Sequence, residues 1–209
     1  LQLEGLFGPV KKVISTKELM DSGTIANLSI DCVILRHTKQ KKMSYQDEMD
    51  YLVSNEMRND FLCNLVYSLK GNTLVLFQFV EKHGTILHAK MDKRLGDKLH
   101  YVYGGTDVVD REAVREYVEK ADDNVILASY GTFSTGVNIK RIDNIVFASP
   151  SKSRIRNLQS IGRGLRKAEG KNSMKLFDIS DDLQCENHTL NHLKERINIY
   201  NEENFTYEI

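Results

Sequence analysis

Short, unbroken apolar segments alternate with amphipathic segments along the chain from about Thr73 onward. The apolar segments are rich in Val, Ile, Phe and Tyr, which is typical of strands that are covered on both faces of a sheet. These segments are residues 73–79, 100–104, 124–129, 144–149 and 174–180. Residues 107–121 and 154–168 instead carry apolar side chains at three- and four-residue steps, which predicts helices. The alternation predicts an α/β fold, a parallel sheet whose right-handed crossovers place helices on both faces.

The first third of the chain shows a different pattern. Residues 44–71 predict one long amphipathic helix, residues 15–23 a short helix, and residues 29–37 a strand. We therefore assign residues 1–42 to a connector that packs on the domain, and residues 43–209 to the domain itself.

Composition places the chain among ordinary globular proteins. Hydrophobic residues make up 41% and charged residues 28% of the 209 residues, which excludes wholesale disorder. No apolar run approaches the roughly 18–20 residues of a membrane span, so no membrane partner is expected. The three cysteines are widely spaced and odd in number, which favours reduced thiols in a cytoplasm, that of the host if the protein is viral. The same spacing predicts no metal site. The chain begins without Met or a signal-peptide pattern, which indicates a fragment.

The formal net charge is zero, but the charges are segregated. Residues 140–175 hold ten basic and two acidic residues, a sum of +8, whereas residues 177–209 hold two basic and eight acidic residues, a sum of −6. A basic stretch of this size can face phosphates even in a neutral protein. Neutrality therefore does not exclude a nucleic-acid partner.

The most informative segment is QSIGRGLRK, residues 159–167. Gln159, Arg163 and Arg166 are four and three residues apart, so they share one face of the predicted helix. Two arginines on one face suit a planar, multi-donor clamp on phosphate oxygens. On its own, the segment is equally typical of a solvent-exposed basic helix face.

A second candidate segment, residues 126–140, runs from an apolar strand into glycines and small hydroxylated residues. Ligands bind beyond the carboxyl ends of parallel strands, where small residues let backbone amides and hydroxyls approach phosphates. An ordinary turn between a strand and a helix has the same composition, and for this segment alone the ordinary turn is the favoured interpretation.

In combination, the segments resemble the second RecA-like lobe of superfamily 2 helicases, over about residues 73–179. TLVLFQF followed by EKHG resembles helicase motif IV, YGGTDVVDREAVREYVE resembles the glycine turn and helix that follow, and ILASYGTFSTGVNI resembles motif V. QSIGRGLRK fits the Q-x-x-G-R-x-x-R form of motif VI. The segments GLFGPVKKVIST and HLKERINIYNEENF, near the two ends, are most similar to the recombination helicases of T-even bacteriophages.

The resemblance implies roles for individual residues. Arg163 and Arg166 would be arginine fingers that stabilise the transition state of phosphoryl transfer, and Gln159 would support them. Gly136 and Asn138 would contact the nucleotide, Asn138 at a position that is often Asp. For His83 an ordinary surface position is the alternative to a nucleic-acid contact. The residues expected to contact nucleic acid are Gln78, Lys82, His83, Gly105, Ser129, Thr132, Ser134 and Thr135.

The sequence motifs that bind ATP and Mg²⁺ in helicases are missing from the chain. There is no G-x-x-x-x-G-K-[ST] phosphate loop. Residues 47–50, Asp-Glu-Met-Asp, imitate a DExD box, but the polar KKMSYQ precedes them in place of a buried strand. We interpret them as the polar face at the start of a helix. ATP with Mg²⁺ would therefore be held mainly by an amino-terminal RecA-like lobe of the same protein, and we expect no ATP hydrolysis by this chain alone.

The resemblance implies an ATP-dependent DNA helicase of recombination and repair. Its expected partners are branched or single-stranded DNA and RNA–DNA hybrids, and its expected activities are branch migration of Holliday junctions, unwinding and strand annealing. A passive nucleic-acid-binding module is the first alternative. A Rossmann-type enzyme acting on a nucleotide or sugar is the second, although the chain has no glycine fingerprint on a first strand-to-helix turn.

Overall fold

The structure is a computed structural model that describes residues 16–135, 139–149, 153, 161–162, 165 and 173–209. Over these residues, seven strands form one sheet in the order β3-β4-β2-β5-β6-β1-β7. All paired strands run parallel, so their carboxyl ends lie at one edge of the sheet, which we call the carboxyl edge. The strands are β1 (Asn27–Arg36), β2 (Thr73–Phe77), β3 (Leu99–Val102), β4 (Val125–Ser129), β5 (Asn144–Phe147), β6 (Ser173–Asp182) and β7 (Thr206–Glu208).

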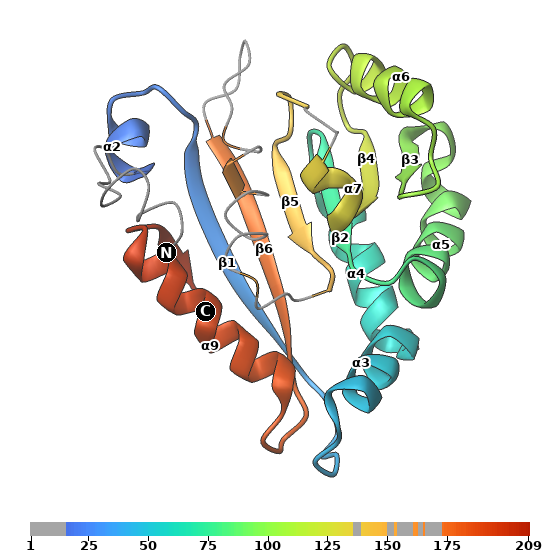
Figure 1. Cartoon of the computed structure of the whole chain (residues 1–209), viewed down its shortest axis with the longest axis vertical. Coiled ribbons are helices and arrows are strands. Elements are labelled where there is room, and N and C mark those ends of the chain that lie inside the picture. The colour runs from blue at the N-terminus through green and yellow to red at the C-terminus, as the bar shows by residue number, and fades with distance from the viewer. Residues whose placement is uncertain (1–15, 136–138, 150–152, 154–160, 163–164, 166–172) are drawn as a thin grey trace, which may run out of the picture.

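Helices lie on both faces of the sheet (Figure 1). The longer ones are α3 (Tyr45–Ser54), α4 (Glu56–Ser68), α5 (Thr85–Leu95), α6 (Val108–Val118) and α9 (His188–Glu202). The shorter ones are α2 (Thr16–Asp21), the π-helical turn η1 (Val80–Gly84), the 3₁₀ turn η2 (Gly96–Lys98) and α7 (Tyr130–Thr135). Helices α4 and α5 pack on one face, while α6 and α9 pack on the other.

Strand β2 shows why its apolar segment is unbroken. Leu74 and Leu76 belong to the core cluster that includes residues of α6 and α9, whereas Val75 and Phe77 belong to the cluster with α4 and α5. All four side chains are fully buried. Because neighbouring strand residues point to opposite faces, a strand covered on both sides needs apolar residues at every position. The predicted α/β fold with a parallel sheet is confirmed.

Strand β1 corrects the predicted domain boundary. Its residues fall within the range assigned to a connector, but β1 lies inside the sheet, paired with β6 along its whole length and with β7 on its other side. One face of the strand is buried in the core cluster that includes residues of α6 and α9, which we call the main core, through Leu28, Ile30 and Cys32. Residues 27–36 are therefore part of the domain, and assigning them to a connector was wrong.

The single helix predicted for residues 44–71 is wrong, because the chain breaks at Asn55 into α3 and α4. Asn55 has an extended backbone, with φ −70° and ψ 112°. Its side-chain oxygen accepts a hydrogen bond from the N–H of Arg58 at 2.9 Å. Asn is among the most favourable residues at a helix start, since this bond satisfies a donor that the helix leaves unpaired. The break is therefore fixed by local chemistry.

Glu48 of α3 is buried, and it caps the start of α9. Its carboxylate accepts hydrogen bonds from the N–H of His188 at 2.8 Å and the N–H of Thr189 at 2.7 Å. Burial acts to raise the pKa of Glu48, but these and further hydrogen bonds hold it below its ordinary value. The segment at residues 47–50 does lie in the first turns of a helix, as predicted. Glu48, however, is 1% exposed, so the prediction of a polar face is wrong for this residue.

Within the described residues, no helix is long and apolar enough to cross a membrane. The same residues contain no group of three or more His, Cys, Asp or Glu side chains that could hold a metal ion. Cys32 and Cys63 are buried, Cys185 is half-buried, and all three are free thiols.

Candidate nucleic-acid interface

An open cavity of about 580 Å³ lies at the carboxyl edge, over the ends of β2, β3 and β4. Parallel pairing brings together three loops that are distant in sequence, the arrangement in which α/β sheets bind ligands. Gln78, Ser129 and Thr132, which the sequence predicted as nucleic-acid contacts, all line this cavity. The other lining residues are Val80, Gly104, Arg111, Tyr130 and Gly131.

Small residues form the end of β4, where Gly131 is exposed and the side chains of Ser129 and Thr132 are buried. The hydroxyls of Ser129 and Thr132 lie 2.8 Å apart, and the N–H of Thr132 donates to Ser129 Oγ at 3.4 Å. At Gly131 the position of a Cβ atom faces open space, with no other atom within 4 Å. The exposed backbone at Gly131 lets a phosphate approach the strand end more closely than a large side chain there would.

The glycine turn after β3 forms another wall of the cavity. Gly104 lines the cavity, whereas Gly105, the residue named from the sequence, is exposed in the same turn. A Cβ on Gly105 would come within 2.8 Å of the Tyr103 ring, so a side chain there requires the ring to move. The contact predicted for Gly105 stays a prediction, and the structure adds Gly104 beside it.

Arg111 is a lining residue that was not among the predicted site residues. Its Nε donates to the carbonyl oxygen of Thr106 at 2.8 Å, so the guanidinium is held against the glycine turn at the cavity. The available signal was a basic residue in the first turns of the helix that follows the glycines. A guanidinium held in place loses less entropy than a mobile one when it binds a phosphate.

Lys82 lies outside the lining of the cavity. Its Nζ forms an ion pair with Asp50 Oδ1 of α3 at 2.8 Å, and both side chains are about half exposed, at 55% and 45%. Exposed pairs of this kind contribute about 0–1 kcal/mol, so Lys82 can exchange Asp50 for a phosphate at little cost. Its nucleic-acid contact stays a prediction.

His83 was predicted to face the bound strand, with a surface position as the alternative, and the structure contradicts both. The side chain is fully buried, with Nδ1 2.9 Å from Ser149 Oγ and Nε2 3.2 Å from Asn59 Oδ1. Burial, helped by the nearby Arg58, lowers the pKa of His83 from 6.5 to about 3. His83 is therefore a neutral side chain that holds the η1 turn against α4 and the end of β5.

Several predicted site residues lie outside the described residues: Gly136, Asn138, Gln159, Arg163 and Arg166. Ser134 and Thr135 are in α7, but their side chains are not described. Ile161 and Leu165, from the same segment as the two arginines, are each 1% exposed and belong to the main core. The N–H of Leu165 donates to the carbonyl oxygen of Ile161 at 3.0 Å, a helical bond between residues four apart.

Residues 57–168, just over half of the chain, match the family model of the helicase conserved C-terminal domain. The chain belongs to this helicase family. It is 32% identical over 99% of its length to the ATP-dependent DNA helicase UvsW of Enterobacteria phage T4, and it spans 45% of that protein. A second relative is the putative ATP-dependent helicase IRC3 of Saccharomyces cerevisiae, 31% identical over 54% of this chain and 16% of its own.

Solved structures agree with the family. The crystal structure of T4 UvsW superposes with a TM-score of 0.74 and 27% identity, covering 88% of this chain and 41% of that one. The C-terminal domain of the DEAD-box protein Dbp5 shares the fold at 14% identity, with a TM-score of 0.58 and coverage of 89% and 91%. The chain is thus a RecA-like C-terminal helicase lobe, and it spans less than half the length of the UvsW proteins it matches.

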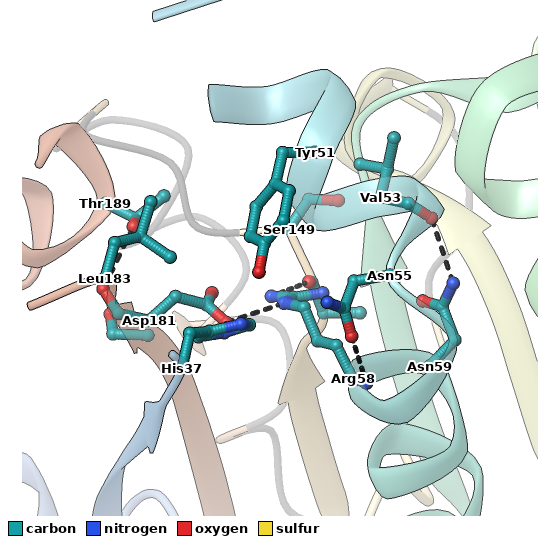
Figure 2. A network of polar contacts seen from close by, with 12 residues as sticks. His37, Tyr51, Val53, Asn55, Arg58, Asn59, Ser149, Asp181, Leu183 and Thr189 are labelled. Carbon is teal, nitrogen blue, oxygen red and sulfur yellow. Dashed lines mark hydrogen bonds and ion pairs between the residues drawn. The ribbon is translucent and has the colours of Figure 1, made fainter. Parts of the chain in front are cut away.

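In this helicase lobe, a buried polar network joins α4 to the ends of β5 and β6 (Figure 2). Arg58 Nε donates to Asp181 Oδ1 at 2.9 Å, and Arg58 Nη2 donates to the carbonyl oxygen of Ala148 at 2.9 Å. His37 Nε2 lies 2.8 Å from the same Asp181 oxygen. Burial would raise the pKa of Asp181, but Arg58 and His37 hold it below its ordinary value. The network and His83 together fix Ala148 and Ser149, the two residues before the segment that carries the predicted arginines.

Proposed function

We propose that the chain is the second motor lobe of an ATP-dependent DNA helicase, which acts on branched DNA in recombination and repair. The activities we propose for the complete protein are branch migration of Holliday junctions, unwinding of RNA–DNA hybrids and strand annealing. The observation that carries the proposal is the 32% identity to T4 UvsW along 99% of the chain. The proposed compartment is the cytoplasm of the host cell.

The proposed nucleic-acid track runs across the cavity at the carboxyl edge. Ser129, Thr132 and the backbone at Gly131 would meet the phosphates, and Arg111 would supply a positive charge at the glycine turn. These contacts go to the backbone of the nucleic acid, so they position a strand without selecting a sequence. A motor that moves along DNA needs contacts of this kind.

The proposed nucleotide contacts lie on the face of the predicted motif VI helix that is opposite its buried residues. Residues four apart on a helix share a face, so the burial of Ile161 and Leu165 supports a helix that turns this face inward. In such a helix, Gln159, Arg163 and Arg166 lie on the opposite, outward face, where they fit the triphosphate of ATP. ATP supplies the phosphoryl-transfer chemistry when it is bound, and the arginines supply positive charge to its phosphate oxygens.

The proposed cycle needs two lobes. ATP and Mg²⁺ would be held mainly by an amino-terminal lobe, because this chain has no phosphate loop. Closure of the two lobes would bring Arg163 and Arg166 to the phosphates, and reopening after hydrolysis would move the lobes along the strand. The chain alone is proposed to be inactive as an ATPase.

A salt titration separates this proposal from its alternatives. We expect the purified chain to bind single-stranded DNA with an affinity that falls steeply as salt rises, because phosphate contacts release counterions. Binding can be followed by fluorescence anisotropy of a labelled oligonucleotide, with a nucleotide sugar as the control ligand. An affinity for DNA that does not change with salt concentration, or tight binding of the nucleotide sugar alone, would favour the Rossmann-type enzyme and contradict the motor lobe. Affinity for DNA that does not respond to ATP in the complete protein would favour the passive module.

A further inference from the structure

A strongly basic loop follows β1 at the carboxyl edge. Residues 36–42, which we call the basic loop, read RHTKQKK, and they connect β1 to α3. The loop lies at the opposite end of the edge from the cavity described above, because β5 and β6 separate β1 from β2 in the sheet. Its basic residues are Arg36, His37, Lys39, Lys41 and Lys42.

Hydrogen bonds hold the backbone of the basic loop in place. The N–H of His37 donates to the carbonyl oxygen of Asp182 at 2.9 Å, and the N–H of Gln40 donates to that of Leu183 at 2.9 Å. The side chain of Gln184 donates to the carbonyl oxygen of His37 at 2.6 Å. The lysines therefore project from a fixed backbone, which lowers the entropy lost when they bind a ligand.

The positive charge of the basic loop is poorly compensated. Lys39 and Lys41 are exposed, and neither forms an ion pair with any acidic side chain in the described part of the chain. Lys42 pairs with Glu186 at 2.7 Å, with both side chains more than 60% exposed, and Arg36 approaches Asp182 only to 3.9 Å. Such surface pairs contribute about 0–1 kcal/mol, so a stronger anion can displace them.

A pocket of about 280 Å³ opens beside the basic loop. The loop contributes one wall, and the helices α3 and α4 contribute the other. Tyr51 stands over the buried Arg58 and beside His37, with the two ring centroids of Tyr51 and His37 5.8 Å apart (Figure 2). The residues that matter here are the cationic Arg36 and Arg58, the rings of His37, Tyr51 and Phe61, and Met57, which is 78% exposed.

We infer that the basic loop and this pocket form a second binding site for a single nucleic-acid strand. Lys39 and Lys41 bind backbone phosphates, and an unpaired base enters the pocket and stacks against Tyr51. A cationic track beside an aromatic side chain is the general arrangement for binding single strands without sequence preference. The pocket is slightly smaller than the roughly 300–1,000 Å³ of drug-sized sites, which suits one base. The inference rests on the proposed function, since it adds a contact to the same track.

The spacing along the sheet sets the length of strand that reaches both sites. Four strand-to-strand steps separate β4 from β1, and at about 4.8 Å a step they amount to about 19 Å. A strand of duplex DNA rises roughly 3.4 Å per nucleotide, so about six nucleotides is the upper limit, and an extended strand with unstacked bases needs fewer. An oligonucleotide of about two residues can occupy one site only, whereas one of about twelve can occupy both.

The test is a salt titration of the chain with the double substitution Lys39→Ala and Lys41→Ala, against labelled oligothymidylates of both lengths. For the long oligonucleotide, the slope of log K against log salt is expected to fall by about 1.4, since each phosphate contact with a single strand contributes about 0.7. For the short oligonucleotide, which can bind at either site but not at both, the slope is expected to fall by less. The matched control is Lys98→Ala with Lys120→Ala, which removes the same charge from exposed positions just before β3 and β4, at the opposite edge.

Tyr51 gives an independent arm of the test. Tyr51→Ala is expected to weaken binding of the long oligonucleotide by about 5- to 150-fold through the loss of stacking, and Tyr51→Phe is expected to restore it. If the unchanged chain shows no salt-sensitive binding, the proposed function fails. Suppose that the unchanged chain binds the long oligonucleotide. The inference of a second site is then wrong if the lysine variant keeps the full salt slope, or if the control variant loses as much of the salt slope as the lysine variant does. Equal affinity of the Tyr51→Ala and Tyr51→Phe variants for the long oligonucleotide would show that no base stacks on Tyr51 in the pocket.

Discussion

Replacing Arg163 with alanine in the complete protein is expected to lower ATP turnover by a factor of about 10³–10⁵, with ATP binding largely retained. An arginine finger acts on charge that develops only in the transition state, so its loss reduces turnover far more than affinity. The rate of ATP turnover is measured at saturating DNA, and the affinity for ATP is measured separately by a nucleotide-binding titration. Buried Ile161 and Leu165, on the opposite face of the predicted helix, keep the segment anchored in the variant.

Two further variants control this result. Arg163→Lys keeps the positive charge but loses the planar group that binds two oxygens, and it is expected to recover only part of the turnover. Arg94→Ala removes an arginine of α5 that packs over the Tyr67 ring of α4, and it is expected to leave turnover unchanged. Full turnover in the Arg163→Ala protein would contradict the arginine-finger role.

The second large effect concerns pH and the buried His83. The stability of the lobe is expected to fall by about 2 kcal/mol between pH 7 and pH 5 through this side chain alone. The pKa of His83 is about 3 in the folded chain and 6.5 ordinarily, so over this range only the unfolded chain takes up the proton. Falling pH therefore favours unfolding. In the His83→Gln variant this part of the pH dependence is expected to disappear.

Urea unfolding at the two pH values, for the unchanged chain and for His83→Gln, measures the difference directly. The substitution itself lowers stability at both values, because it disturbs the contacts with Ser149 and Asn59, so only the change with pH is compared. An identical pH dependence in His83→Gln would show that folding does not lower the pKa of His83.

The sheet could be predicted from local patterns wherever a strand is covered on both faces. β2 and β4 are unbroken apolar segments, and the structure buries every residue in them. β1 was placed as a strand but assigned to a connector, because its partner β6 is distant in sequence and no local pattern reveals that pairing. The break at Asn55 was within reach, since Asn followed by Glu at a helix start is a recognisable capping signal.

In the candidate site, too, some residues could be predicted from local patterns and others could not. The small residues after β4 were predicted because strand ends in parallel sheets bind ligands, and Ser129 and Thr132 do line a cavity there. His83 and Glu48 were misplaced, because polar residues in a polar segment give no sign that tertiary contacts will bury them. Ser149 and Asn59 bury the first, and the start of α9 buries the second. The sequence alone does not mark the basic loop as a site, because the pocket beside it is formed by helices that come later in the chain.

The most direct test of the central claim, that this chain is one lobe of a two-lobed motor, is DNA-stimulated ATP turnover measured for the chain alone and for the complete protein. We expect no turnover above background for the chain alone at any DNA concentration, because its sequence has no phosphate loop to hold ATP and Mg²⁺. We expect DNA-stimulated turnover for the complete protein. Robust, DNA-stimulated turnover by the chain alone would contradict the account.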